Sequence, residues 1–369
     1  MNNKKFKTFF DCGSSKIRAG TFNINNHEEA FYSDSEFFTD GSNLDLKIQK
    51  IITSLEKDSN EYINSINLML DSSKMLSVSI SLTKKLDGSG LKQANIQFLV
   101  QEAKQQILKH YLSHSIVHII INNYKIDGVD YSYLPNKIKC NSVTLDIFFI
   151  CLPSDLILYF KNVFSKSNIL VNQIICSSYA KSINYKDNLS LSGNSSFIDV
   201  GFNKTSIISY HNNKILSLDI LPIGGNHITK DISLILKIDL ESSEQEKCNF
   251  DQNLKIPNKK DISINTLEKI IFARTEEILE LCLKSIELNS YTLNDFRMIL
   301  MGEGSKILDN QHKDKISFSN DIDFLEETLE DVCQSGLKFE AGLNKQEVVL
   351  IAKKQTKRGF FEKLFHFFQ

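Results

Sequence analysis

The sequence predicts an α/β protein built from a duplicated domain, and three observations carry that prediction. In "FFDCGSSKIRAG", an apolar strand ends at Asp11, a tight turn follows with Gly13, and a second strand begins. The stretch "SFIDVGFNKTSIISYHNNKI" repeats this pattern around Asp199 and Gly201. Two further glycine turns follow, each between an expected strand and an expected helix. Because D-x-G is common, one copy predicts only an ordinary β-hairpin. Two copies in matching settings favour duplication.

Composition and charge indicate a globular protein without general affinity for nucleic acid. The 369 residues are 41% hydrophobic and 24% charged, as in folded soluble domains. A net charge of −2 gives no overall attraction to a polyanion, so we expect no nucleic-acid partner. Seven scattered cysteines, with no pair at zinc-ligand spacing, are typical of free thiols in a reducing cytoplasm.

Neither apolar stretch of the chain predicts a membrane span or a signal peptide. The opening "KKFKTFF" is followed too soon by Asp11 to form the apolar region of a signal peptide. The stretch "VTLDIFFICL" contains Asp146 and is about half as long as a membrane-spanning helix. It predicts a core strand instead.

The two hairpins have residues suited to a phosphate and a metal ion. An acid at the end of a buried strand, followed by a turn of small residues, can hold a hydrated metal while backbone N–H groups donate to phosphate oxygens. Two such hairpins facing each other would grip a polyphosphate from both sides. Asp11 and Asp199 would then bind its Mg²⁺ through water.

The two glycine turns extend the pattern. Gly224 and Gly225 stand before an amphipathic helix expected from about Thr229, and Gly302 and Gly304 before another expected helix. Paired glycines at such turns let a flat ring or a phosphate approach the backbone and the helix N-terminus closely. Each turn alone is a weak signal, but the order D-x-G, D-x-G, GG, G-x-G is a stronger one.

That order resembles the actin/Hsp70/sugar-kinase superfamily, and further motifs are similar to its FtsA branch. "YKIDGVDYSYLPNKIKCNSVTLDIFFICLP" resembles the signature of the FtsA inserted subdomain. "IGGNHITKDISLILKIDLESSEQEK" and "LEKIIFARTEEILELCLKSI" resemble motifs of its second half. The resemblance implies actin-like duplicated ribonuclease-H-like domains with an FtsA-type inserted subdomain (1C) and a C-terminal amphipathic helix.

The resemblance also implies a division of the chain and a role for its matching residues. Subdomain 1A would cover 1–82 and 162–194, the inserted subdomain 83–161, subdomain 2A 195–229 and 292–342, subdomain 2B 230–291, a linker 343–358 and the amphipathic helix 359–369. ATP would be held by the phosphate-1 residues Asp11, Gly13, Ser14, Ser15 and Lys16, the phosphate-2 residues Asp199, Gly201 and Thr205, the turn residues Gly224 and Gly225, the ribose contacts Glu244 and Lys247, and the adenine neighbours Gly302 and Gly304.

The chain departs from the family pattern at the nucleotide. Phe202 and Asn203 replace small residues in the second turn, and Glu303 brings a carboxylate near the expected nucleotide. These residues are expected to weaken the binding of ATP and Mg²⁺. Lys204 either supplies compensating charge or is a surface lysine. Only Gln173 is placed to orient a water, so we expect at most weak ATPase activity.

Two helical patterns carry further expectations. Glu244 and Lys247, at i and i+3, share one face of a helix; the alternative to their role as ribose contacts is an ordinary solvated helix surface. The stretch "DFLEETLEDVCQSGL" predicts a helix that ends at Gly336 as a C′ glycine.

The last residues predict an interfacial membrane helix. An aromatic stripe follows a basic polar segment, which favours a membrane anchor over docking on the protein's own domain. The expected membrane residues are Phe360, Phe361, Leu364, Phe365, Phe368, Lys357 and Arg358.

The resemblance implies a structural adaptor. Such a protein polymerises on the cytoplasmic face of the cell inner membrane at the division septum. It binds the C-terminal peptide of FtsZ through subdomain 2B and other division proteins through the inserted subdomain. The alternatives are an ATP-dependent kinase or phosphatase of the same superfamily with a small-molecule substrate, and a pilus-assembly relative of FtsA.

Overall fold

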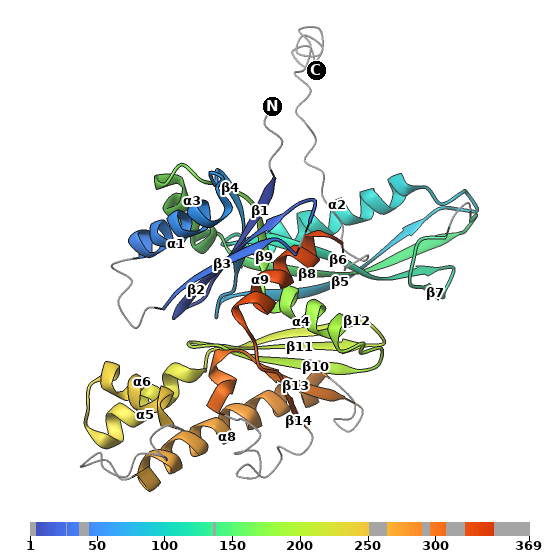
Figure 1. Cartoon of the computed structure of the whole chain (residues 1–369). Helices are drawn as coiled ribbons and strands as arrows, with labels where there is room; N and C mark the ends of the chain where they lie inside the picture. Colours follow the sequence, from blue (N-terminus) through green and yellow to red (C-terminus); the bar gives the residue numbers. More distant parts are fainter. Residues whose placement is uncertain are drawn as a thin grey trace.

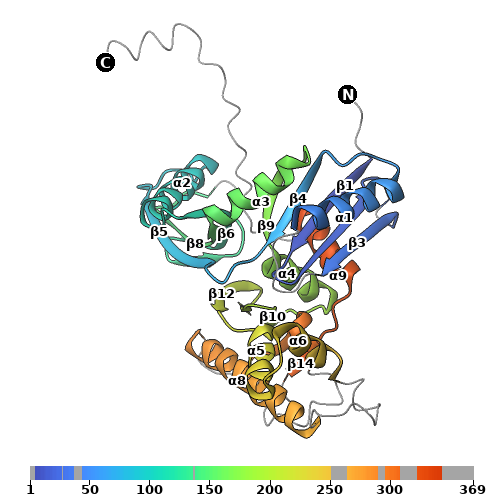
Figure 2. The ribbon, with the colours of Figure 1, turned by 90° about the vertical axis from the view of Figure 1, so that its left-hand side faces the viewer.

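The protein consists of two similar halves, with a smaller unit inserted into the first, as a computed structural model shows (Figures 1 and 2). The structure describes residues 5–26, 28–36, 44–135, 138–250, 264–289, 296–307 and 322–342. The first half and the inserted unit lie above the second half in both views.

The first half is built on a five-stranded sheet in the order β3-β2-β1-β4-β9. The first three strands are antiparallel, and β4 and β9 run parallel to β1. Helices cover both faces, which explains why β1 and β2 are almost wholly buried instead of alternating. The elements are β1 (Phe6–Cys12), β2 (Lys16–Asn23), β3 (Ala30–Glu36), β4 (Ser65–Leu70) and β9 (Leu170–Cys176), with α1 (Leu44–Ser59) and α3 (Ser154–Lys166) on one face and α4 (Ser177–Asn188) and α9 (Leu329–Glu340) on the other.

The second half repeats this sheet in the order β12-β11-β10-β13-β14. Again three antiparallel strands are followed by two that run parallel to the first. Helix α4 packs between the two sheets (Figure 1). The equal strand order and direction confirm the duplication. The elements are β10 (Ser195–Val200), β11 (Thr205–His211), β12 (Lys214–Leu221), β13 (Arg297–Met301) and β14 (Ile322–Phe324), with α5 (Gly225–Leu236), α6 (Leu240–Cys248) and α8 (Ile264–Asn289).

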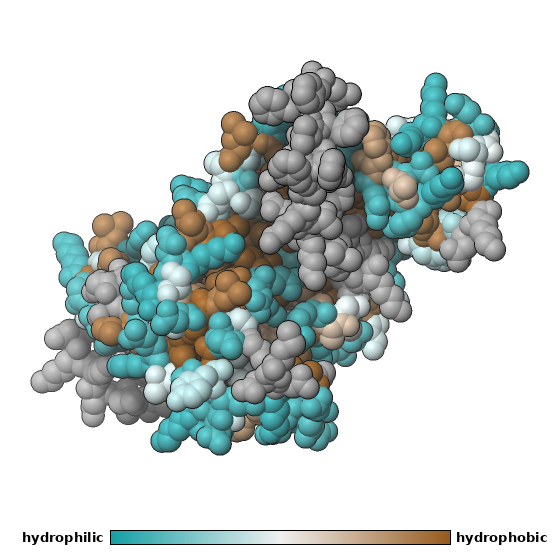
Figure 3. All heavy atoms as spheres, turned by 90° about the horizontal axis from the view of Figure 1, so that it is seen from above, coloured by the Kyte–Doolittle hydropathy of each residue, from teal (hydrophilic) through white to brown (hydrophobic). Residues whose placement is uncertain are grey.

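The inserted unit has a four-stranded sheet of its own, in the order β5-β8-β6-β7. It projects from one side of the molecule with polar and apolar residues mixed over its surface (Figure 3). Strand β8 joins two cores, because Phe149 and Cys151 face the inserted unit whereas Ile150 and Leu152 face the first half. The elements are β5 (Leu76–Lys85), α2 (Gln93–His110), β6 (His114–Ile126), β7 (Val129–Tyr131) and β8 (Ser142–Pro153).

The predicted end of a helix at Gly336 is wrong. Helix α9 continues through Gly336 to Glu340. A Cβ at this glycine would lie 2.7 Å from a ring carbon of Phe9 and 2.8 Å from the sulfur of Met69. Gly336 therefore does not end the helix; it lets the helix approach the central strands of the first sheet.

Two other boundaries also differ from expectation. Helix α5 begins at Gly225, one turn before the expected start near Thr229. The G-x-G turn after β13 leads into a short 3₁₀ helix, η3 (Glu303–Ile307). Among the described helices, none is both long enough and apolar enough to cross a membrane.

Several expected segments lie outside the described residues. These are the linker 343–358, the amphipathic helix 359–369 with its seven expected membrane residues, and residues 251–263 of subdomain 2B.

Candidate functional site

The two hairpins found in the sequence face each other across the space between the halves. Their turns have the same backbone geometry: the N–H of Gly13 donates to the carbonyl of Lys16 at 2.9 Å, and the N–H of Gly201 donates to that of Lys204 at 2.9 Å. Both turns line one cavity of about 90 Å³, here called the phosphate-loop cavity. The hairpins are thus related in space as well as in sequence.

Both strand-ending acids border the phosphate-loop cavity. Asp11 is 6% exposed and Asp199 is 5% exposed, because each lies in a strand with a paired neighbour on either side. A buried carboxylate is costly unless charged or hydrogen-bonding groups surround it. The two acids obtain those groups in different ways.

Asp11 is neutralised from its own half. The guanidinium of Arg18, directly opposite Asp11 in the hairpin, donates to Oδ2 at 3.1 Å. The hydroxyl of Ser177, at the start of α4, donates to Oδ1 at 2.6 Å. Arg18 also donates to Glu303 of the second half at 2.6 Å. One arginine therefore serves the first hairpin and links it to the other half.

Asp199 is neutralised from the opposite half. The ammonium of Lys181, on α4, lies 2.8 Å from Oδ2 of Asp199. The same ammonium lies 3.1 Å from Oε1 of Glu327 and donates to Oε2 at 3.2 Å. Burial alone would lower the pKa of Lys181, but the two carboxylates raise it well above its usual range. The two carboxylates therefore favour the charged form of Lys181 inside the cleft.

Glu303, expected to repel a nucleotide, is already paired with cations. It accepts from Arg18 and forms an ion pair with Lys306 at 2.8 Å, while Lys16 lies 4.0 Å away. Burial would raise the pKa of Glu303, but Lys306 and Arg18 outweigh it and lower the pKa to about 2. The carboxylate is ionised and its charge is balanced at neutral pH.

Lys204 is not a surface lysine. Its side chain is 12% exposed, borders the phosphate-loop cavity and forms an ion pair with Asp71 of the first half at 3.0 Å. The corresponding residue of the first turn, Lys16, instead pairs with Asp34 at 2.9 Å and Glu36 at 3.1 Å, both on its own sheet. Lys204 therefore lies at the cavity, and its charge is paired with Asp71.

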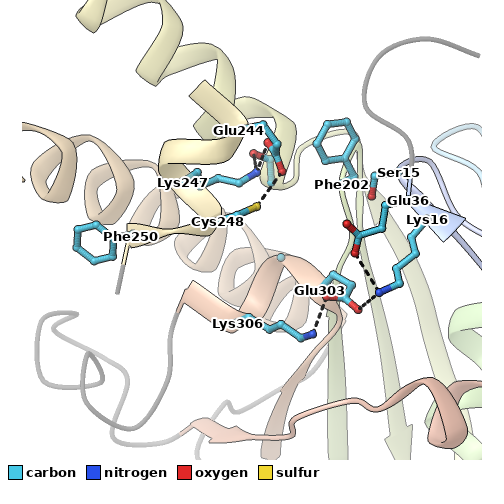
Figure 4. Close-up of a pocket in the computed structure, with 12 residues that line it drawn as sticks. Ser15, Lys16, Glu36, Phe202, Glu244, Lys247, Cys248, Phe250, Glu303 and Lys306 are labelled. Atoms are coloured by element: carbon cyan, nitrogen blue, oxygen red, sulfur yellow. Dashed lines mark hydrogen bonds and ion pairs between the residues drawn. The ribbon is translucent and has the colours of Figure 1, made fainter. Parts of the chain in front are cut away.

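A second, larger cavity of about 320 Å³ adjoins the first (Figure 4). Ser15, Lys16, Phe202 and Glu303 line both cavities, so the two lie side by side. The larger part, here called the base cavity, is also lined by Glu36, Gly225, Glu244, Lys247, Cys248, Phe250, Gly304 and Lys306. Aromatic rings beside polar groups suit a flat, partly polar ligand.

Glu244 and Lys247 do not lie on a solvated helix face. They are 5% and 7% exposed and form an ion pair at 2.6 Å on α6. Lys247 also donates to Oγ1 of Thr229 at 2.9 Å and to the carbonyl of Gly225 at 3.1 Å. The pair joins α6 to the start of α5 and presents its edge to the base cavity.

The N-terminus of α5 is bonded to the second hairpin. The N–H of Gly225 donates to the carbonyl of Gly201 at 3.0 Å, and that of Asn226 to the carbonyl of Phe202 at 2.7 Å. A Cβ at Gly224 would lie 2.4 Å from the carbonyl oxygen of Gly201. The glycine therefore allows α5 to pack directly on the second turn, and two of its leading donors are used there.

All the predicted nucleotide residues except Thr205 and Gly224 border one of the two cavities. Thr205 is fully buried and donates to the carbonyl of Ile223 at 2.8 Å. Gly302 has a φ of +94°, and a Cβ there would lie 2.4 Å from Oδ1 of Asp199. Gln173 borders neither cavity, so it does not lie where it would orient a water.

Sequence reasoning missed several residues of the phosphate-loop cavity. Arg18 had a signal, because the register of a tight hairpin places it opposite Asp11. Lys181 and Glu327 had none, since they reach the cavity only through the packing of α4 and of the chain before α9. The residues missed are Arg18, Asp71, Ser177, Lys181 and Glu327.

The cavity residues do not fit a hydrated Mg²⁺ between the two acids. Asp11 and Asp199 each already have a cationic side chain within 3.1 Å. In the described part of the chain, no group of three or more His, Cys, Asp or Glu residues has the arrangement of a metal site.

Comparisons with known proteins identify the second half most clearly. A family model described as "Cell division protein FtsA" matches residues 196–338. The FtsA of Buchnera aphidicola subsp. Schizaphis graminum is 24% identical over 204 residues, 51% of this chain and 48% of that protein. The FtsA of Bacillus subtilis is 32% identical over 113 residues, 27% of this chain and 25% of that protein. The matches span about half or less of these relatives' length.

Among solved structures, a chain of the PilM-PilN type IV pilus biogenesis complex has a similar fold. It aligns with a TM-score of 0.63 over 88% of this chain and 89% of that chain, at 10% identity, which shows a shared fold alone. Together with the family match and the curated relatives, the duplicated sheets confirm the resemblance predicted from the sequence: residues 196–338 of this chain are similar to FtsA, and its two halves have the duplicated actin-like fold.

Proposed function

We propose that this chain is an actin-like cell-division protein that polymerises on the inner face of the cytoplasmic membrane, at the septum, and tethers FtsZ to it. The observation that carries the proposal is the FtsA family match at residues 196–338. This range holds the second hairpin, α5, α6 and α8 of the second half, and most of α9, which packs on the first sheet.

The cleft suits an adenine nucleotide as a structural or regulatory ligand. The base cavity offers the Phe202 and Phe250 rings with the Glu244–Lys247 pair, and the adjoining phosphate-loop cavity is lined by lysine and arginine side chains. Aromatic rings favour a flat base, and clustered cations favour phosphate. ATP or ADP is the ligand that matches both parts.

An adaptor fits the cleft better than a kinase or phosphatase does. Phosphoryl transfer requires a group that orients or deprotonates the attacking oxygen. Among the described residues that line the phosphate-loop cavity, Asp11, Asp199, Asp71 and Glu327 are all engaged by cations of the chain. We therefore expect at most weak ATPase activity.

Membrane attachment is proposed from the sequence of residues 359–369. Fully burying five large apolar side chains contributes roughly 8–15 kcal/mol, at about 1.5–3 kcal/mol each. Insertion at an interface is partial, and ordering about ten residues costs roughly 1–2 kcal/mol each. One helix would bind marginally, whereas many helices on one polymer would bind by avidity.

The proposed contacts with proteins lie on two surfaces. The C-terminal peptide of FtsZ would bind subdomain 2B, roughly residues 230–290, where Leu234 and Ile235 of α5 are 78% and 54% exposed. The inserted unit, which projects from the first half, would contact the next subunit of a filament and other division proteins (Figure 3). Its sheet ends at β7, where a strand of a partner has room to pair.

The proposal is tested by sedimentation with anionic liposomes and a labelled FtsZ C-terminal peptide. The full chain should carry the peptide into the pellet, and deletion of residues 359–369 should leave both in the supernatant. A matched control, His366→Gln, changes the other side of the same expected helix and should pellet normally.

Three results would contradict the proposal. Pelleting by the truncated chain would place the anchor elsewhere. Robust steady-state ATP turnover with a small phosphoryl acceptor would favour the enzyme. Loss of peptide capture with retained liposome binding would favour the pilus-assembly alternative, which the shared fold alone does not distinguish.

A further inference from the structure

The phosphate-loop cavity, which Asp11 and Asp199 border, contains a buried cation, the ammonium of Lys181. The ammonium of Lys181 lies between Asp199 and Glu327, with its side chain 7% exposed. The carboxylate of Asp11, on the opposite wall, is held by Arg18 and Ser177. Each strand-ending acid is thus balanced by the chain itself.

We propose that the Lys181 ammonium takes the place of a divalent cation in this cavity, so that the cleft binds the phosphates of a nucleoside di- or triphosphate without Mg²⁺. The inference rests on the proposed function, because it takes the cleft as a nucleotide site. It concerns which cation neutralises the phosphates there.

Coordination chemistry supports the replacement. Mg²⁺ requires near-octahedral oxygen ligands and keeps several water molecules. To bind between Asp11 and Asp199, it would have to displace Arg18 and Lys181, or lie beside them without screening from solvent. Displacement would separate buried ion pairs, and the second arrangement would bring like charges close together where solvent screens them little; both are unfavourable.

Other cations surround the same space. Lys204, on the second turn, and Lys16, at the end of the first, border the cavity together with Arg18 and Lys181. Lys204 pairs with Asp71 at 3.0 Å, and a phosphate would share this ammonium with Asp71. Phosphate oxygens would then meet ammonium and guanidinium groups on several sides, and would share them with the carboxylates that pair with them in this structure.

The experiment measures ATP binding to the full chain by calorimetry, first in excess Mg²⁺ and then in excess EDTA. The proposal expects dissociation constants that agree within about threefold. A loss of about tenfold or more in EDTA would overturn it.

A variant of Lys181 tests whether this residue is responsible for ATP binding without Mg²⁺. Lys181→Met should bind ATP at least about tenfold more weakly in EDTA and regain affinity when Mg²⁺ is added. Lys186→Met makes the same change on the same helix, away from both cavities, and should behave as the unchanged chain does. If Lys181→Met does not fold, the comparison of Mg²⁺ with EDTA on the unchanged chain still decides the matter.

Failure of this inference differs from failure of the proposed function. Absence of ATP binding in both buffers overturns the inference but leaves liposome and FtsZ-peptide capture to be judged by sedimentation. Mg²⁺-dependent binding overturns the inference and supports a conventional nucleotide cleft.

Discussion

The two hairpins share strand order, turn geometry and a buried acid, yet they neutralise that acid in different ways. In the first, Arg18 lies on the adjacent strand, so the hairpin carries its own counter-charge. In the second, the residue opposite Asp199 is Ser206, and the counter-charge comes from Lys181 on α4. One hairpin is electrostatically self-sufficient, and the other depends on the opposite half.

This difference explains how the cleft is held together. The pairs Lys181–Asp199, Lys204–Asp71 and Arg18–Glu303 all join the first half to the second. The sequence predicted two hairpins that grip a polyphosphate from both sides. In the structure, side chains of the protein join the walls, and a nucleotide would add to contacts that already exist.

The largest expected effect comes from removing the cation of the second hairpin. Lys181→Met leaves the carboxylates of Asp199 and Glu327 buried without their shared partner, so it should lower the free energy of unfolding by about 3–5 kcal/mol. Urea denaturation measures the change. Lys186→Met on the same helix should cost less than about 1 kcal/mol, and an equal loss in both variants would show that Lys181 has no special role.

Removing the cation of the first hairpin should cost less. Arg18→Met leaves Asp11 with the hydrogen bond from Ser177, and Glu303 with its pair to Lys306. We expect a loss of about 2–3 kcal/mol in the same denaturation measurement. A loss larger than that of Lys181→Met would reverse the proposed order of the two hairpins.

The packing of α5 on the second turn depends on a glycine, Gly224, and Gly193 serves for comparison. Gly224→Ala would place a methyl group 2.4 Å from the carbonyl of Gly201, so α5 must move off the second turn. Overpacking of this kind should cost about 1–3 kcal/mol. Gly193→Ala, with no atom within 4 Å of its added Cβ, is the matched control and should change stability by less than about 0.5 kcal/mol.

The smallest effect is pH-dependent and concerns Glu303. Its pKa is lowered from 4.5 to about 2 in the folded state, so its stabilisation is present above pH 4.5 and is lost as the pH falls toward 2. A shift of this size corresponds to roughly 3 kcal/mol. Because the side chain is 33% exposed, solvent screening reduces this to about 1–2 kcal/mol.

The comparison of Glu303→Gln with the unchanged chain measures that contribution. The difference in unfolding free energy between them should be largest at neutral pH and should shrink between pH 4.5 and 2. A difference that stays constant over this interval would show that the carboxylate charge does not contribute.

The sequence predicted those parts of the site that are local in the chain. Each hairpin is encoded by a short apolar strand, an acid and a glycine, so their positions and the duplicated fold followed from pattern alone. Gly336 was misread, because a glycine near the end of a helical pattern is usually a cap, whereas here it makes room for Phe9 and Met69.

The charge balance of the cleft was harder to predict. Arg18 could have been paired with Asp11 from the hairpin register. Lys181 lies in a helix whose orientation depends on packing between two sheets, and Glu327 precedes α9 without a motif of its own. Pairs of this kind depend on tertiary structure, so neither residue's neighbours in the sequence reveal them.

A double-mutant cycle on Lys181 and Asp199 tests most directly whether the second hairpin depends on the opposite half. The variants are Lys181→Met, Asp199→Asn and the two combined, and chemical denaturation gives the free energy of unfolding of each. The account predicts a coupling energy of about 2 kcal/mol or more, since Lys181→Met leaves the Asp199 carboxylate buried without its cation, whereas Asp199→Asn leaves Lys181 paired with Glu327. A coupling energy near zero would contradict it and would mean that the halves are not joined through this ion pair.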